Sequence, residues 1–452
     1  MLIKINKLIV LGVTAFSCLA QAQDTIRIFP LENYSQNIPD FIDSNNEKPL
    51  ISSEILEDRV ANYKEHLYGN LSPWSQSFIN AILTAPSPND IQDIEQSLWS
   101  LYQQKCDSAD AVSFAENYKA YSCKWFSDIY KKMNLSQFKS LQYDKHNSAI
   151  ATENILARAL PTDSPLFKHH TFAGEGYPFD CLQVSALWLG SPLYILGDTD
   201  DKAWALVITN SGFIAWVPSQ KIARVDSNFI REYGKHVHEN GLKIITHTET
   251  IIKNMTEKAA LHTSYIGSIF PASSPHSTNH IMIPSRHANG FAALETAAVN
   301  KEYVATFPVQ ASPKNFAHII EELIDRPYGW GGMYFYNDCS QEIQSIFTTF
   351  GIWLPRNSVD QVQAGKIEDL SELTTPARIG GLSTSGRHLV TLVYIKGHIM
   401  LYVGNHVYNS VSGIDAPVVY NNMWGMRPAD NTYRSIIGQA AFFPIFDSNK
   451  HP

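Results

Sequence analysis

The chain has 452 residues, a formal net charge of −8 and 12% aromatic residues. This length is sufficient for three or four domains of ordinary size, each with its own core. The negative charge leaves no basic footprint, which argues against nucleic acid or anionic lipid as a partner, and the aromatic content favours a packed, β-rich protein.

Residues 1–22 have the pattern of a secretory signal. Two lysines precede an apolar run from Leu8 to Leu19, and the segment ends in Ala-Gln-Ala. Because the run is too short to span a membrane comfortably, we predict cleavage near Ala22, export to the periplasm or cell envelope, and no transmembrane segment in the mature chain. A lipoprotein site at Cys18 is the less favoured alternative, since the alanine and phenylalanine upstream fit such a site poorly.

Residues 23–165 are predicted to hold a leader and a small helical domain. Up to about residue 50 the chain is polar and lacks periodicity, so we expect this leader to lie across another domain. From about 54 to 135 apolar residues recur at helical spacing, as at Ile91, Ile94 and Leu98. These residues indicate no chemistry of their own, and we assign the region a scaffold role.

Cys106 and Cys123 lie in this helical region, 17 positions apart. An exported protein meets an oxidising compartment, so the two are candidates for a disulfide. Two buried thiols are the alternative.

Residues 166–310 have the pattern of β structure. Over 166–228, short apolar runs split by turns with Asp, Asn and Gly predict a small barrel. Residues 229–310 repeat the pattern more loosely, with strands expected near 243–248, 281–283 and 292–299, and predict a second, divergent module of the same kind.

The most informative feature of the sequence begins with a glycine-rich turn at 329–332. Asp338, Cys339 and Ser340 follow it, and then a run of helical periodicity that ends at Gly351. A thiol in the first helical turn lies near unpaired N–H groups and the positive end of the helix dipole, which lowers its pKa toward the reactive thiolate. Burial alone would raise the pKa, and a small buried cysteine capping a core helix is the structural alternative.

Downstream, the segment 397–404 alternates strictly, as a strand with one buried face does. This places His398 at the edge of a strand, where it can reach the thiol. A second short strand at 418–425 contains Asn421, which could hold the imidazole in the useful tautomer. The three residues would then act as nucleophile, base and orienter.

Together these motifs resemble the NlpC family of papain-like cell-wall endopeptidases. The matching segments are Tyr-Gly-Trp-Gly-Gly at 328–332, Asp-Cys-Ser at 338–340, Leu-Pro-Arg-Asn-Ser at 354–358 and Gly-His-Ile-Met-Leu-Tyr-Val-Gly at 397–404. Residues 176–183 resemble the start of the bacterial SH3 domain that precedes the peptidase in one branch of the family. The patterns and the resemblance together predict an α+β multidomain chain: a helical N-terminal domain within 23–165, SH3-like barrels at 166–228 and 229–310, and a papain-like α+β peptidase domain at 311–452.

Members of that branch cut the γ-D-glutamyl to diamino-acid bond of peptidoglycan stem peptides and need no cofactor. The resemblance therefore implies an enzyme with Cys339 as nucleophile and His398 as base. Asn421 takes a third position that is often histidine in the family, so its orienting role is the least firmly assigned. The hydroxyl of Tyr328 would help the backbone N–H of Cys339 to bind the oxyanion, the alternative being an aromatic that only packs the glycine turn.

The resemblance also implies a substrate subsite. Asp338 and Tyr177 would hold the free amine of the stem peptide's L-alanine, and Ser340 would contact the D-glutamate. As an alternative, Asp338 could serve as a helix cap without binding substrate. Arg356 could pair with a substrate carboxylate, but we expect it to brace its loop. Gln341 stands where the family usually has glycine, and is compatible with a helix.

Two rival functions use the same residues. One is a catalytically silent wall-binding protein, against which the intact Cys and His pattern argues. The other is an amidase or acyltransferase on a papain-like fold, which would not require Tyr177 or Asp338. The paired histidines at 169–170 and 236–238 lack carboxylate or thiol partners at zinc spacing, so we predict no metal site.

Overall fold

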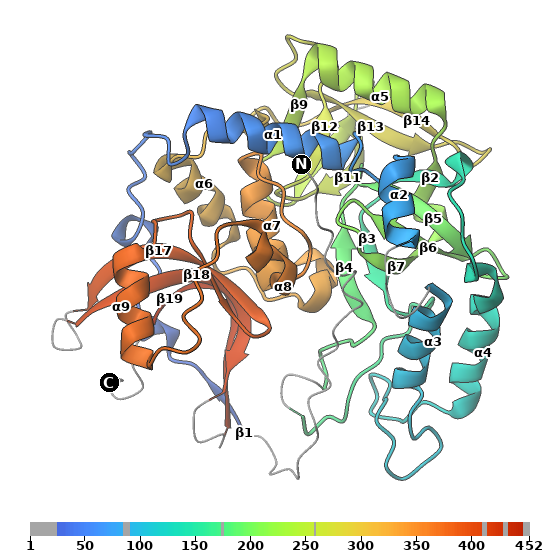
Figure 1. Ribbon diagram of the computed structural model, residues 1–452, viewed down its shortest axis with the longest axis horizontal. Coiled ribbons are helices and arrows are strands. Elements are labelled where there is room, and N and C mark those ends of the chain that lie inside the picture. The colour runs from blue at the N-terminus through green and yellow to red at the C-terminus, as the bar shows by residue number, and fades with distance from the viewer. Residues whose placement is uncertain are drawn as a thin grey trace.

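The computed structural model describes residues 25–84, 91–172, 176–256, 259–408, 414–427 and 433–445. The predicted signal segment 1–22 and Cys18 lie outside the described residues. No helix within the described ranges has both the length and the apolar character needed to cross a bilayer. The helices and strands form a multidomain α+β protein (Figure 1).

The C-terminal part is an α+β unit built on one five-stranded sheet. In spatial order its strands are β1 (Thr25–Ile28), β19 (Tyr433–Pro444), β18 (Ile414–Met426), β17 (His398–Tyr408) and β16 (Leu392–Ile395). Neighbours are antiparallel except β1, which runs parallel to β19. The helical segments are α6 (Pro313–Leu323), η6 (Trp330–Phe335), α7 (Cys339–Thr349), α8 (Ser358–Gln361), η7 (Val362–Ala364) and α9 (Thr375–Ser385).

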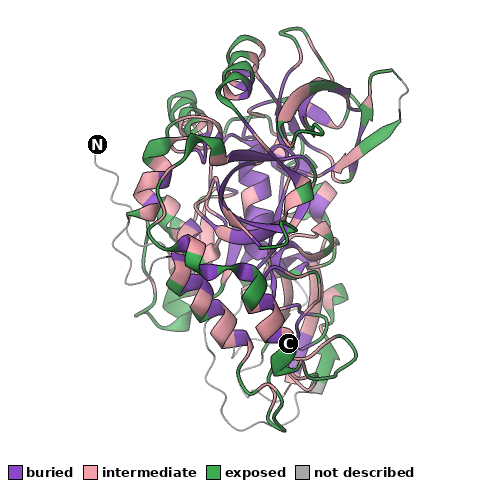
Figure 2. Cartoon of the chain, turned by 90° about the vertical axis from the view of Figure 1, so that its right-hand side faces the viewer, coloured by how far each residue is buried: buried purple, intermediate pink, exposed green. Residues whose placement is uncertain are grey.

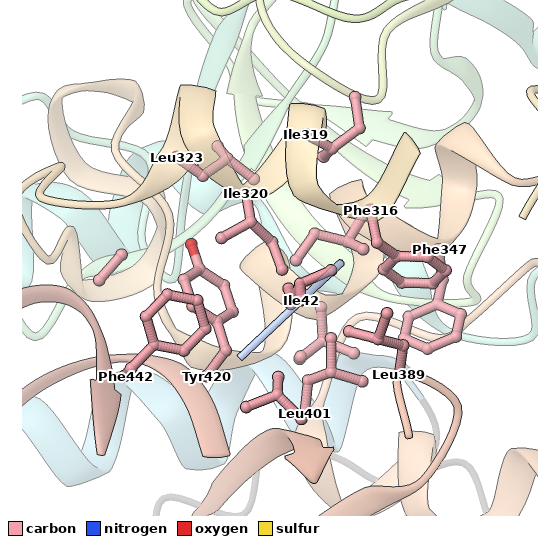
Figure 3. Packing of buried hydrophobic residues seen from close by; sticks show 14 of the residues in the cluster. Ile42, Phe316, Ile319, Ile320, Leu323, Phe347, Leu389, Leu401, Tyr420 and Phe442 are labelled. Atoms are coloured by element: carbon pink, nitrogen blue, oxygen red, sulfur yellow. The ribbon is translucent and has the colours of Figure 1, made fainter. Parts of the chain in front are cut away.

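The core of this unit lies between the sheet and the helices α6 and α7. Phe316 of α6 stacks on Phe350 at the end of α7, with ring centroids 4.2 Å apart. From the sheet, Tyr420 and Phe442 pack against each other and face the side chains of α6 (Figure 3). Burying large aromatic rings in this way is the main source of stability for such a layer.

The leader lies across this unit, as predicted. Strand β1 extends one edge of the sheet, and Ile42 is fully buried in the same core (Figure 3). Two short 3-10 turns lie between them, η1 (Leu31–Asn33) and η2 (Ile38–Asp40).

The barrel starts before residue 166, where it was predicted to begin. Its seven strands, in spatial order, are β4 (Gln183–Leu187), β3 (Ile155–Arg158), β7 (Ile214–Pro218), β6 (Trp204–Thr209), β5 (Pro192–Asp198), β2 (Ser148–Ala151) and β8 (Ile222–Arg224), with the turn η5 (Ser219–Lys221). Strands β2 and β3 were missed because each has four residues and little exposed surface, so neither shows the alternation that marks a half-buried strand.

The second module contains the strands expected at 243–248, 281–283 and 292–299, but it opens with a helix that was not predicted. The helix α5 (Ser227–Asn240) begins after Asp226, whose side chain accepts from Asn228 and Phe229 N–H. Phe229, Tyr233 and Val237 recur every four residues and are buried, so helical spacing was present in the sequence.

Two small sheets follow α5. One has the order β11 (Ala260–Ser264), β10 (Thr250–Asn254), β14 (Ala292–Ala298) and β13 (His280–Arg286), and the other the order β12 (Ile269–Pro271), β9 (Leu242–Ile245) and β15 (Val304–Thr306).

The predicted N-terminal helices form, but they have no core of their own. They are α1 (Ser53–Leu67), α2 (Gln76–Leu83), α3 (Ile91–Tyr102) and α4 (Cys123–Met133), followed by the turns η3 (Leu135–Phe138) and η4 (Lys145–Asn147). Buried residues of α2, α3 and α4 share a cluster with Trp216 of the barrel, while α1 packs with α5. The buried residues therefore gather in the centre of the molecule rather than in a separate helical domain (Figure 2). Cys106 and Cys123 are joined in a disulfide, with their Cα atoms 5.0 Å apart.

Candidate active site

Cys339 is the first residue of α7, and its thiol is buried. Asp338 caps the helix, since its Oδ1 accepts from the backbone N–H of Gln341 at 2.9 Å. The expected lowering of the thiol pKa is wrong for the free protein, because burial and the adjacent Asp338 carboxylate raise the pKa of Cys339 to about 12. A hydrogen bond from the backbone of Ile399 acts in the opposite direction but does not compensate. The resting nucleophile is therefore a neutral thiol.

His398 begins β17, immediately before the residue that bonds to the thiol. Ile399, Leu401 and Val403 belong to the core cluster, as predicted for one face of this strand. Met400 and Tyr402 on the other face are buried as well, so the strand has no solvent-exposed face here. The Nε2 atom of His398 lies 3.3 Å from Oδ1 of Asn421, and Asn421 is 2% exposed. Burial lowers the pKa of His398, so the imidazole is neutral near pH 7. When Nε2–H donates to Asn421, Nδ1 is left as the free proton acceptor.

Arg356 and Asp338 form a buried ion pair beside the nucleophile. Arg356 Nη2 lies 2.6 Å from Asp338 Oδ2, and Nη1 lies 3.1 Å from Oδ1. The guanidinium also donates to Ser340 Oγ at 2.8 Å and to Ser185 Oγ at 2.9 Å. Arg356 therefore braces its surroundings, as expected, and it does so across a domain boundary, because Ser185 belongs to strand β4 of the barrel.

The glycine pair at 331–332 is where the barrel meets the catalytic unit. Both residues have positive φ, at +57° and +79°. A Cβ on Gly331 would lie 2.4 Å from the backbone oxygen of Gln183, and one on Gly332 would lie 2.6 Å from the Cβ of Ala186. No other residue type fits these two positions, so the Gly-Gly motif serves close packing against β4. Gln341, the departure from the family pattern, also reaches Ala186, through a long contact of 3.4 Å to its oxygen.

Tyr328 lies close to the nucleophile. Burial and the neighbouring Cys339 and Asp338 raise the pKa of its hydroxyl well above the usual value, so it stays protonated and can donate. Its backbone N–H bonds to Gly438 O at 2.8 Å, which fixes this segment on β19. A contribution of the Tyr328 hydroxyl to an oxyanion site stays a prediction.

The predicted substrate residues Ser340 and Tyr177 differ in burial. Ser340 is buried, and its hydroxyl already bonds to Asp338 and Arg356. Tyr177 is 58% exposed, and its ring contacts Phe167 of the same domain at 5.4 Å. No hydrogen bond or ring contact among the described residues joins Tyr177 to Asp338.

The loop that carries Tyr177 nevertheless docks beside the site. Phe179 packs edge-on against Trp330, at 5.9 Å, and against Trp424, at 5.0 Å. Trp330 precedes the glycine pair, and Trp424 follows Asn421 on β18. The barrel thus supplies one side of the region around Cys339.

Sequence reasoning missed Ser185 and Glu342 among the residues around the site. Ser185 holds the Arg356 brace from the barrel, and Glu342 is buried one turn after Cys339. A carboxylate at an interior helical position next to a candidate nucleophile was the signal for Glu342.

These features agree with two sequence families. The NlpC/P60 family matches residues 325–431, and the SH3 domain of the SH3b1 type matches residues 165–218. The chain contains an NlpC/P60 domain preceded by an SH3b1-type domain. NlpC/P60 proteins are cysteine endopeptidases that act on peptidoglycan.

A solved NlpC/P60 endopeptidase from Photobacterium damselae subsp. piscicida resembles most of the chain. It is 29% identical in sequence with a TM-score of 0.79, covering 94% of this chain and 92% of that chain. An NlpC/P60 family protein from Bacillus cereus is 17% identical with a TM-score of 0.38, covering 60% of this chain and 79% of that one. No match was found among proteins with curated functions.

Proposed function

We propose that this chain is an exported cysteine endopeptidase that hydrolyses the γ-D-Glu to meso-diaminopimelate bond of peptidoglycan stem peptides. The observation that supports it is the arrangement of Cys339, His398 and Asn421 inside an NlpC/P60 domain. Cys339 begins a helix, Ile399 bonds to its thiol, and Asn421 holds the adjacent imidazole. Nothing in this chemistry requires a cofactor.

The reaction starts from a neutral thiol and a neutral imidazole. As the sulfur of Cys339 attacks the carbonyl carbon, His398 Nδ1 takes the thiol proton. The backbone N–H of Cys339 and the Tyr328 hydroxyl stabilise the negative charge on the carbonyl oxygen. His398 then gives the proton to the departing diaminopimelate nitrogen, which leaves a thioester. Water attacks the thioester while His398 takes its proton, and His398 returns that proton to the sulfur as L-Ala-D-Glu leaves.

The proposal includes a preference for stems with a free N-terminal L-alanine. Among the described residues, Asp338 Oδ1 accepts from Gln341, Ser340 and Arg356, whereas Oδ2 accepts from Arg356 alone. Oδ2 therefore keeps capacity for an ammonium group. The paired guanidinium weakens the attraction for a second cation, so the Tyr177 hydroxyl is needed as an additional partner.

Defined muropeptides test the bond. We expect incubation of L-Ala-γ-D-Glu-meso-diaminopimelate to give the L-Ala-D-Glu dipeptide and free diaminopimelate, identified by mass. Cleavage of a muramyl-linked stem between N-acetylmuramic acid and L-alanine, which releases the whole stem peptide, would instead indicate an amidase. No product from any wall fragment would support a binding protein.

The same assay tests the amine preference. We expect kcat/KM for the free tripeptide to exceed that for the muramyl-linked stem by about tenfold or more, since one charge-assisted contact is lost. Tyr177→Ala should narrow this ratio. Equal kcat/KM on both substrates would show an open cleft that works on intact wall.

A further inference from the structure

Glu342 is a buried carboxylate that the chemistry proposed above does not use. It lies on α7, one turn after Cys339, and is 1% exposed. Its carboxylate accepts from the hydroxyl of Tyr420 at 2.5 Å and from Nδ2 of Asn337 at 2.7 Å. The side chain of Asn422 is a further hydrogen-bond partner. Burying a carboxylate costs folding free energy, which its hydrogen bonds offset only in part. A glutamate retained at this position is therefore a candidate for a functional role.

These partners belong to the segments that carry the site. Asn337 immediately precedes the cap Asp338. Tyr420 and Asn422 are the two neighbours of Asn421 on β18, and since strand side chains alternate, both face α7 while Asn421 faces away. Figure 3 shows Tyr420 in the core that joins the sheet to the helices, beside Phe442.

A second layer of hydrogen bonds closes the cluster. Asn422 Nδ2 donates to the backbone oxygen of Asn337 at 3.0 Å, and the same oxygen accepts from Gly329 N at 3.0 Å. The loop before Cys339 and the strand that carries Asn421 are therefore bonded to each other as well as to Glu342. A shift of α7 along β18 would break all of these contacts together.

Burial raises the pKa of Glu342 to about 7, and the hydrogen bonds of the cluster act against burial by favouring the ionised carboxylate. Tyr420 and Asn337 both act as donors toward Glu342, and a carboxylate is the side chain that accepts at every lone pair. A glutamine of the same shape would place an NH2 group against one of these donors. The charged groups near the cluster are Arg326 and Asp325, both on the loop after α6.

We propose that Glu342 is a positioning residue that locks α7 to β18, so that Asn421 holds His398 in register with the thiol of Cys339. This inference rests on the proposed function of the same site. It predicts that removing the acceptor slows the chemical step without weakening substrate binding.

The test compares Glu342→Gln with Glu95→Gln. Glu95 is the matched control, because it is also a buried helical glutamate, but its carboxyl group accepts from Trp216 Nε1 in the barrel core, away from Cys339. Glutamine can still accept the hydrogen bond from Trp216. Two readouts are needed: kcat and KM on the free tripeptide, and the rate at which iodoacetamide alkylates Cys339, followed on its own peptide by mass spectrometry.

We expect Glu342→Gln to lower kcat at least about tenfold with KM within about threefold, which is the pattern of a lost transition-state interaction. Alkylation of Cys339 should slow toward the rate of His398→Ala, and Glu95→Gln should match wild type in both assays. If Glu342→Gln does not fold, Tyr420→Phe removes one donor without a cavity and should lower kcat several-fold.

Values of kcat and alkylation rate within twofold of wild type in the folded variant would overturn the inference. Alkylation needs no substrate, so the role of Glu342 is tested even if wild-type protein cleaves no wall peptide. A failure of wild-type protein to cleave any wall peptide would count against the proposed function alone.

Discussion

Arg356 holds Asp338 through two parallel hydrogen bonds, Nη2 to Oδ2 at 2.6 Å and Nη1 to Oδ1 at 3.1 Å. Asp338 is both the cap of α7 and the neighbour that raises the thiol pKa, so this ion pair controls the position and the charge environment of Cys339. The side chains are only 7% and 13% exposed, and the pair is therefore little screened by solvent.

Arg356→Ala should destabilise the fold by about 3 kcal/mol or more, because it leaves a buried carboxylate without its partner. Urea unfolding measures the loss. The exposed pair Lys124 and Asp128 is the control, and Lys124→Ala should change stability by less than about 0.5 kcal/mol. Equal effects of the two variants would mean that the Arg356 pair is not the brace described above.

Asp338→Asn should make Cys339 more reactive toward iodoacetamide, although it should lower hydrolysis. The carboxylate raises the thiol pKa, and removing it leaves the Arg356 cation, which lowers that pKa. The alkylation rate between pH 7 and 9 measures the change, with Cys181 as an internal reference thiol in the same digest. A slower reaction of Cys339 would show that the helix cap matters more to the thiol than the charge.

The stability of the protein should fall as pH rises from about 5 to about 8. Burial raises the pKa of Glu95 to about 8, so the folded protein holds a proton that the unfolded chain has lost, and that contribution disappears as pH rises. One pKa unit corresponds to about 1.4 kcal/mol. Melting temperatures at intervals across this range should fall less steeply in Glu95→Gln, whereas the exposed Glu54→Gln should follow wild type. Parallel curves for wild type and Glu95→Gln would refute this.

The Cys106–Cys123 disulfide should be present in protein purified without reductant. It closes a loop in which Phe114 pairs with Phe167, near the segment that leads to Tyr177. Peptide mapping without reductant should recover the two cysteines as one linked fragment, and reduction should lower stability by about 3 kcal/mol. Two free thiols in freshly prepared protein would contradict this.

Much of the catalytic unit could be predicted from sequence because its signals are local. Helical spacing after Cys339 and alternation around His398 each depend on a few consecutive residues, and both elements form as expected. The shared core of the N-terminal helices and the barrel could not be predicted, since periodicity shows that a face is apolar but not which partner covers it.

The contacts around the nucleophile show the same limit. Arg356 could be seen in its motif, but the partner Ser185 is 171 positions away. The pKa of Cys339 depends on burial, which the position at a helix start does not reveal. The helix α5 differs from these cases, because the helical spacing of its buried residues is present in the sequence. It lies between two segments with a β pattern, which concealed that signal.

The most direct test of the account is the cleavage of L-Ala-γ-D-Glu-meso-diaminopimelate by wild type, Cys339→Ala and Asn421→Ala, followed by mass spectrometry. We expect wild type to release diaminopimelate and Cys339→Ala to lose at least about a thousandfold in rate while keeping its fold, since it lacks the nucleophile. Asn421→Ala should lose less, because an orienting residue transfers no proton. Turnover by Cys339→Ala above a tenth of wild type would contradict the assignment of this thiol as the nucleophile.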